Sequence, residues 1–270
     1  MDRIKKKAQR YINKVWKAFN KFEMRVLPGN VAFFFVLALI PIITIIAFIA
    51  ARFSISLDTL VNMVNNILPE ETSRIIVDAI SGKGFDTSVG TFNVIAFASC
   101  TNGTFAIVSA SNTLYNIKDS DKLKDRVKSV MLLVILLLLI IFLLLVPVFG
   151  GQILSLFQNS VIYKEIRMIY QILKWPTTFF FIYLSLKLIY TIAPSKFIPS
   201  YTTTYGALFT TFCWTVATAV FGYYLEYFAN YNIIYGNLSS IIILMMWMYL
   251  ISYVFVLGIA INAVNLNDKS

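Results

Sequence analysis

Side chains that could carry out catalysis are scarce in this sequence. None of the 270 residues is histidine, which removes the commonest general base and the commonest zinc ligand. The three acids Asp119, Asp121 and Asp125 cluster beside Lys118, Lys122 and Lys124. This pattern is typical of a mixed-charge helix surface and not of carboxylates that converge on two metal ions. No HExxH, CxxC, Walker-type or GxSxG motif occurs. The sequence therefore predicts a protein that is not an enzyme and that holds no metal or cofactor.

The most unusual chemistry is a polar run inside an apolar segment at residues 89–115. Its centre reads SCTNGT, from Ser99 to Thr104. In a bilayer each unsatisfied polar group costs several kcal/mol, so these groups need partners. Either neighbouring helices pack tightly against them, or the helix lines a cavity that holds water or substrate. Under the second hypothesis the pathway is lined by Asn93, Thr101, Asn102, Thr104 and Asn112, with Tyr223 and Tyr227 near the outer mouth.

Charged residues within the long apolar segments are few. Lys174 and Glu226 fall near the same end of two consecutive segments, so they could form an ion pair or gate the outer end of a pathway. Lys187 lies close enough to a segment end to reach the cytoplasmic surface.

The elements that position these residues are membrane helices. Of the chain 59% is hydrophobic and only 13% charged, with a mean hydropathy of +0.75. Six apolar runs have about the 20 residues that a helix needs to cross a bilayer. They lie at residues 31–51, 89–115, 127–149, 166–193, 201–228 and 238–264. The predicted fold class is an all-α integral membrane protein with six transmembrane helices.

The distribution of Lys and Arg predicts the orientation. Residues 1–30 carry nine of them, and the loop after the second run carries a further group, whereas the alternate loops are poor in both. Because cytoplasmic loops are enriched in Lys and Arg, both termini are predicted to be cytoplasmic. The predicted organisation is a basic amphipathic helix at 1–30, a membrane domain at 31–264 with an outer amphipathic helical segment at 54–88, and a cytoplasmic tail at 265–270.

The basic N-terminal segment has apolar residues at helical spacing between its lysines. This pattern favours a helix on the membrane surface, where residues 1–25 contact anionic lipids of the inner leaflet and Trp16 anchors the interface. An RNA-binding arm is the less favoured alternative, so we expect no nucleic-acid partner. Self-association into a homo-oligomer is left open.

Several segments resemble the YihY/BrkB family of membrane proteins, also called virulence factor BrkB and once labelled ribonuclease BN. Residues 32–41 (AFFFVLALIP) resemble its first span, and 109–115 (SASNTLY) the end of its second. Residues 235–238, 247–249 and 258–263 resemble its last helix, with Ala260 at the family's acidic position and Ala38 at the family's serine. The resemblance implies six helices in a bacterial inner or plasma membrane. The missing histidines argue against the ribonuclease label.

Two functions follow from these patterns. The first is a transporter or translocase of a lipid, another amphiphile or a small polar solute, with its polar site along the second span. The alternative is a non-catalytic scaffold that organises envelope partners, in which the small residues of that span only pack against other helices.

Overall fold

The computed structural model describes residues 9, 12–13, 15–37, 89–156, 163–227 and 239–267. Within these ranges the chain is helical and contains no strand. The long helices are α5 (Val89–Leu114), α6 (Lys122–Leu156), α7 (Tyr163–Ile192), α8 (Thr204–Tyr227) and α10 (Ser239–Asn267). A 3-10 helix, η1 (Phe22–Arg25), precedes a shorter apolar helix at Leu27–Leu37.

Five of the predicted spans each coincide with one long helix. The bounds differ by up to seven residues, because α6 extends beyond its apolar centre at both ends. Three described segments are long and apolar enough to cross a membrane: Tyr163–Ile192, Thr204–Leu225 and Ile241–Leu266. The second half of the first span and the outer segment at 54–88 lie outside the described residues.

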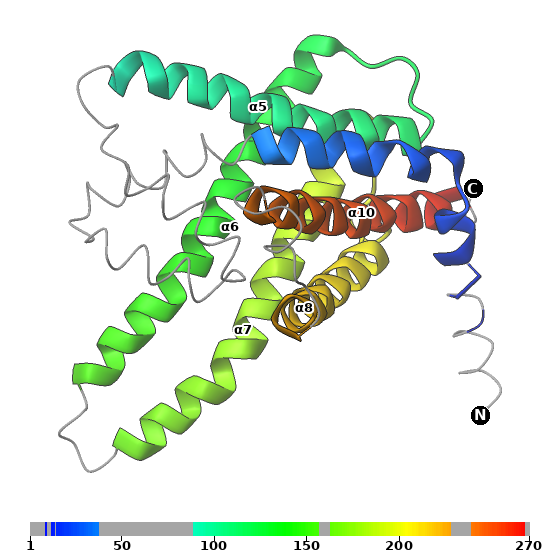
Figure 1. Ribbon diagram of the computed structural model, residues 1–270. Helices are drawn as coiled ribbons and strands as arrows, with labels where there is room; N and C mark the ends of the chain where they lie inside the picture. Colours follow the sequence, from blue (N-terminus) through cyan, green and yellow to red (C-terminus); the bar gives the residue numbers. More distant parts are fainter. Residues whose placement is uncertain are drawn as a thin grey trace.

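The helices converge at one end of the molecule. Figure 1 shows α6 and α7 running side by side toward the lower left, away from the region where the other helices meet. At this shared end lie the C-terminus of α5, the start of α6, the end of α7, the start of α8 and the end of α10. The hydrophobic core draws on all five helices and on the N-terminal segment. It includes Met24, Ile107, Leu132, Ile189, Tyr190, Phe255 and Ile259.

Helices α8 and α10 cross in close contact at two glycines. A Cβ atom on Gly206 would collide with the Gly258 carbonyl oxygen and Asn262, and one on Gly258 would collide with Thr210 and the Tyr190 hydroxyl. The Gly206 N–H donates to the Asn262 Oδ1 at 2.8 Å. The buried Tyr190 hydroxyl donates to the Phe255 carbonyl at 2.9 Å, which adds α7 to the same contact.

Both ends of the α5–α6 connection are capped. After α5, Asn116 adopts φ 55°, the Ile117 N–H donates to the Asn112 carbonyl and the Asn116 N–H to the Thr113 carbonyl. This is the Schellman pattern that ends a helix. At the start of α6, the Asp121 carboxylate accepts from the Leu123 N–H at 3.0 Å and the Lys124 N–H at 3.5 Å. The two caps fix where Asn112 and the first turns of α6 face one another.

The N-terminal segment differs from the single helix that its periodicity predicts. The described helical stretch at 15–19 ends in a turn at Asn20, and Lys21 has an extended backbone before η1 begins. The Lys21 ammonium donates to the Leu114 carbonyl at the end of α5 at 3.1 Å. Lys21 is therefore tied to the helical bundle. Trp16 is 66% exposed, and its predicted place at a membrane interface stays a prediction.

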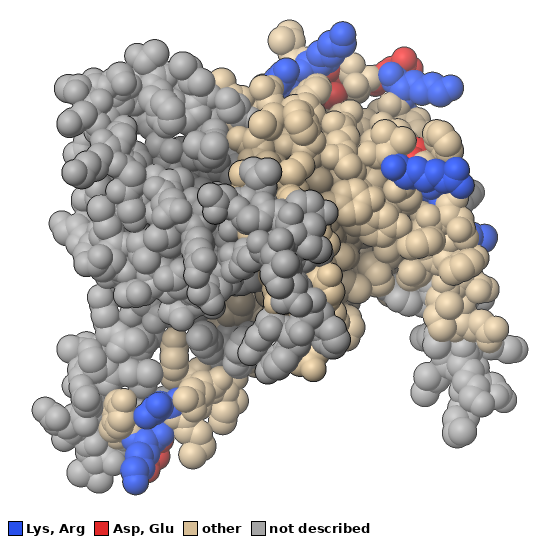
Figure 2. Space-filling view, in the orientation of Figure 1, with Lys and Arg blue, Asp and Glu red and all other residues tan. Residues whose placement is uncertain are grey.

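Charged residues lie at opposite ends of the described surface. In Figure 2 the Lys, Arg, Asp and Glu atoms gather along the upper rim, where α6 begins, and at the right, where the N-terminal segment and the end of α5 lie. A smaller group lies at the lower left, where α7 begins. The described surface between them lacks such charged atoms in this view. This is the distribution expected of helices that pass through an apolar layer.

Candidate functional site

Three polar side chains from three segments meet in the interior, and we call them the buried polar cluster: Asn112 of α5, Asp125 of α6 and Ser195 of the α7–α8 loop. The Asn112 amide donates to the Asp125 carboxylate at 3.2 Å and to the Ser195 hydroxyl oxygen at 2.6 Å. The Ser195 N–H donates to the Asn112 Oδ1 at 2.8 Å, and the Ser195 hydroxyl donates to Asp125. Each member thus bonds to both others.

The burial of Asp125 corrects the sequence analysis. Asp119 and Asp121 are exposed, as a mixed-charge surface predicts, but Asp125 is only 4% exposed. Asp125, Ser129 and Leu132 recur at helical spacing, and all three are buried. This spacing places Asp125 on the inward face of α6. The neighbouring Lys128 ammonium, which donates to the Pro194 carbonyl, adds a second link to the α7–α8 loop and a positive charge near the carboxylate.

The predicted polar residues of the second span divide into two sets. Thr104, Ser111 and Asn112 are buried among other helices. The Thr104 hydroxyl is bonded to the Ser129 carbonyl of α6 at 2.8 Å, which is a packing contact between the two helices. The other set comprises Asn102, Ser109 and Thr113, which are exposed or half-buried on a different face of α5. Thr101 is half-buried and donates to the Ala98 carbonyl within its own helix at 2.7 Å.

Arg126 of α6 reaches across to the second set. Its Nη1 donates to the Asn102 Oδ1 at 2.8 Å, and its guanidinium carbon lies 4.4 Å from the centre of the Phe105 ring. A hydrogen bond and a cation–π contact together hold this long side chain in one orientation.

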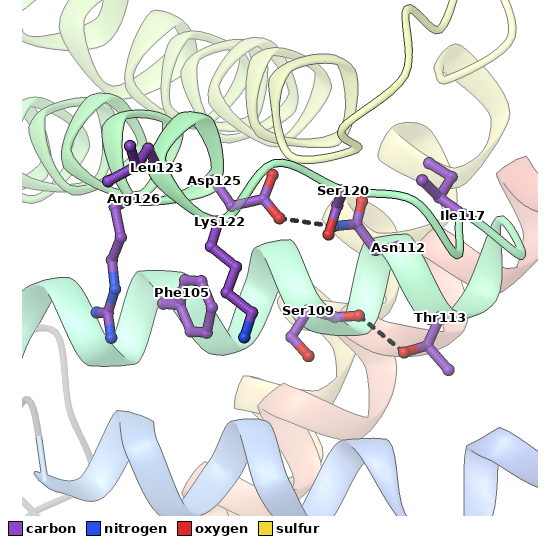
Figure 3. A pocket seen from close by; sticks show the side chains of 10 residues that line it. All are labelled: Phe105, Ser109, Asn112, Thr113, Ile117, Ser120, Lys122, Leu123, Asp125 and Arg126. Carbon is purple, nitrogen blue, oxygen red and sulfur yellow. Dashed lines mark hydrogen bonds between the residues drawn. The ribbon is translucent and has the colours of Figure 1, made fainter.

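An open hollow of about 420 Å³ lies between α5 and the start of α6. Figure 3 shows the Lys122 and Arg126 side chains descending from α6 in front of α5, with Ser109 and Thr113 to their right on α5. Asn112 and Asp125 of the buried polar cluster also line it, bonded to each other on the side of the α7–α8 loop. The hollow therefore combines two cations, the Asp125 carboxylate, three hydroxyl groups, the Asn112 amide, and the apolar side chains of Phe105, Ile117 and Leu123.

Among the described residues, the predicted pathway residue Tyr223 lies away from this hollow. Tyr223 is 57% exposed in α8 and is absent from the lining. The side chains of Asn93, Lys174, Glu226 and Tyr227 lie outside the described part of the structure, so the predicted ion pair stays a prediction. Among the described residues no group of three or more His, Cys, Asp or Glu side chains could hold a metal ion.

Sequence reasoning missed Asp125, Ser195 and Arg126 as site residues. The helical spacing of Asp125 with Ser129 was a usable signal for the first. Ser195 lies in a loop, and its approach to Asn112 depends on how α7 packs against α6. Arg126 belongs to a basic stretch in which several side chains are equivalent by sequence alone.

The long apolar helices and the polar residues buried between them define a helical membrane protein. The sequence model of the virulence factor BrkB family matches residues 15–269, and the chain belongs to that family. This confirms the resemblance noted from the sequence motifs.

Similar proteins come from several bacteria. The ribonuclease-like protein YfkH of Bacillus subtilis is 26% identical over 259 residues, covering 94% of each chain. A UPF0761 membrane protein of Cronobacter sakazakii is 26% identical over 276 residues, covering 96% of this chain and 89% of that protein. Another, from Chromobacterium violaceum, is 32% identical over 114 residues, covering 41% of this chain and 27% of that protein. No solved structure matches.

Proposed function

We propose that this membrane protein of the BrkB family is a transporter or translocase whose polar route follows the open face of α5. The observation that carries the proposal is that Asn102, Ser109 and Thr113 lie outside the packed core, although they belong to an apolar helix. The Asn102 Oδ1 accepts from Arg126 and the Thr113 hydroxyl donates to the Ser109 carbonyl, but the Asn102 amide N–H groups and the Ser109 hydroxyl still need partners. Facing lipid hydrocarbon, each such polar group without a partner would cost several kcal/mol. Water or a polar substrate in front of this face removes that cost.

The surroundings of the hollow favour an amphiphile as substrate. On α6 the exposed apolar residues Leu123, Val127 and Met131 begin beside Lys122 and Arg126. A molecule with a polar and an apolar part would find a matching surface for each. A small polar solute would use only the polar part.

The first test measures movement across a bilayer. Purified protein in liposomes is assayed for translocation of a fluorescent phospholipid and for uptake of a small polar solute. Asn102→Leu removes the oxygen that holds Arg126 and makes the α5 face apolar, so at least one of these activities should fall about tenfold. Val216→Leu, at an exposed apolar position of α8 away from the hollow and from the α6 surface, is the matched control. Unchanged activity in a folded, well-expressed Asn102→Leu protein contradicts the proposal.

A second test asks whether water reaches the open face. In a background with Cys100 and Cys213 replaced by Ala, single cysteines are placed at Asn102 or Val134. Both positions lie about three helical turns from the shared end of the bundle, and both side chains are exposed. A membrane-impermeant thiol reagent reacts with thiolate in water. We expect Asn102→Cys to be labelled and Val134→Cys to stay unlabelled, whereas labelling of neither means that lipid covers both.

The second candidate function is a scaffold for envelope partners. The Thr104–Ser129 contact favours it, because this part of the polar run serves helix packing. A scaffold would lose partner capture when residues 1–25 are changed and would keep it in Asn102→Leu. A transporter would lose transport in Asn102→Leu and would keep it when residues 1–25 are changed.

The placement in the cell follows the charge pattern. We propose six spans in a bacterial inner or plasma membrane, with both termini cytoplasmic, so that the shared end of the bundle faces the cytoplasm.

We also propose that the chain is not an enzyme. The name of YfkH raises RNA cleavage as the activity to exclude, and purified protein incubated with RNA should leave it intact. Cleavage that survives further purification and disappears in Asp125→Asn would overturn this.

A further inference from the structure

The strongest feature outside the packed core is the pair of cations at the rim of the hollow. Lys122 is the first residue of α6, and Arg126 follows one turn later on the same face. Both ammonium and guanidinium groups therefore project into the same open space (Figure 3). The N-terminal end of a helix adds a partial positive charge at this place.

Arg126 is oriented before any ligand arrives. Its bond to Asn102 uses one of five N–H donors, and Phe105 supports the face of the guanidinium plane. A planar fork held in this way suits the oxygens of a phosphate or carboxylate. Ser109 and Thr113 also line the hollow. The Thr113 hydroxyl donates to the Ser109 carbonyl, so the Ser109 hydroxyl is the one of the two that could donate to a ligand.

The nearby carboxylate of Asp125 does not form an ion pair with Lys122 or Arg126. Asp125 is bonded to Asn112 and Ser195, on the side of the α7–α8 loop. In Figure 3 its side chain points along α5 toward Asn112, whereas Arg126 points toward the other end of the hollow. Lys124, which does not line the hollow, is the lysine that pairs with Asp121, at 3.6 Å.

An apolar surface continues from the cations along α6. Leu123 is 79% exposed, and the exposed stripe recurs every three or four residues as Val127, Val130, Met131, Val134 and Leu138. The stripe begins beside the hollow and runs toward the middle of the helix. A ligand with an anionic head in the hollow has room for hydrocarbon chains along this stripe, which a soluble anion would leave uncovered.

We propose that the hollow binds the phosphate of an anionic phospholipid of the cytoplasmic leaflet, held by Lys122 and Arg126, with its acyl chains along the exposed stripe of α6. Basic pockets next to membrane helices bind such headgroups in this way. The inference rests on the proposed function for its place in the membrane, and it names the class of amphiphile that the hollow would take.

The test measures lipid retention by native mass spectrometry of the full chain, after incubation with phosphatidylglycerol or phosphatidylcholine. The double variant Lys122→Gln/Arg126→Gln should retain phosphatidylglycerol about tenfold less than the native chain, with no change for phosphatidylcholine. The control Lys118→Gln/Lys124→Gln removes the same charge from the same stretch outside the hollow, and should change retention less than about twofold. Equal losses in both variants mean unspecific charge attraction and overturn the site.

Two further arms keep the result interpretable. Lys122→Arg preserves both charges and leaves the contacts of Arg126 with Asn102 and Phe105 in place, so it should keep most of the retention. A loss in this variant as large as in the Gln variant would point to misfolding. Inorganic phosphate is added as a competitor of the retained phosphatidylglycerol. If phosphate displaces it as effectively as added phosphatidylglycerol does, the hollow binds a soluble anion and the lipid proposal is rejected. If retention depends on Lys122 and Arg126 while Asn102→Leu leaves translocation unchanged, the lipid site stands and the transport function fails. The reverse pattern rejects the site and keeps the function.

Discussion

The Asp125 carboxylate is the residue on which the shared end of the bundle depends most. It is nearly inaccessible, and it accepts hydrogen bonds from side chains of α5 and of the α7–α8 loop. A buried carboxylate with neutral donors and one lysine nearby stays stable only while these partners are in place. The same bonds hold together the wall of the hollow that faces the α7–α8 loop.

Removing this carboxylate should destabilise the fold. Asp125→Ala leaves the buried amide of Asn112 and the hydroxyl of Ser195 without their shared acceptor, and we expect the free energy of unfolding to fall by about 2–4 kcal/mol. Asp125→Asn keeps one acceptor oxygen and should lose less. Denaturant unfolding in detergent, followed by tryptophan fluorescence, measures both. Asp119→Ala, at an exposed position, is the control, and an equal effect there would contradict the role of the cluster.

Helices α8 and α10 owe their close crossing to glycines that have no room for a side chain. In Gly258→Ala the new methyl group would meet Thr210 and the Tyr190 hydroxyl, so the helices must separate or the hydroxyl must lose a partner. We expect a loss of about 1–3 kcal/mol in the free energy of unfolding. Gly222→Ala, within α8, meets nothing within 4 Å and should be neutral or slightly stabilising. Similar losses in both variants would show that helix propensity or some other effect dominates.

The stability of the start of α6 should depend on pH, because the Asp121 carboxylate caps this helix. The N–H groups of Leu123 and Lys124 donate to Asp121 and hold the pKa of its carboxyl below the usual value for aspartate. A carboxyl whose folded pKa is depressed stabilises the fold above the unfolded pKa of about 3.9, and this contribution is lost as the pH falls through the lower folded value.

The stability difference between the native chain and Asp121→Ala should therefore be constant above about pH 4 and shrink below it. Melting temperatures across this range, measured in detergent with Asp119→Ala as control, give the difference directly. A difference that does not change with pH would mean that the carboxyl oxygens bond equally well when protonated.

The elements of this fold were more predictable from sequence than the contacts between them. Apolar runs of the right length marked five helices to within a few residues, because burial in a bilayer requires long continuous hydrophobic segments. The interruption at Asn20 and Lys21 was not predicted, since it depends on the bond from Lys21 to the end of α5. The polar run of α5 was recognised, but its division into a packed and an open set depends on which faces α6 and the other helices cover.

At the scale of the whole molecule, length and charge together argue for the crossing of a membrane. Helix α6 has 35 residues and α7 has 30, which corresponds to about 52 Å and 45 Å of helix against a hydrocarbon core of about 30 Å. Helices of these lengths that cross the core would extend past it at both ends. The charges at the start of α6 and those at the start of α7 fall on these extensions, at opposite ends of the described surface (Figure 2).

The orientation can be tested with two cysteines in the background without Cys100 and Cys213. Lys118→Cys lies before α6 and Lys164→Cys at the start of α7, and both positions are exposed. An impermeant maleimide should label Lys164→Cys in intact cells and Lys118→Cys only in inverted vesicles, because the proposed orientation places the lysine-rich side in the cytoplasm. The opposite pattern would mean that the protein has the reverse orientation in the membrane, with the hollow at the outer leaflet. Labelling of both from one side would mean that α6 does not cross, and that its exposed apolar stripe faces something other than lipid.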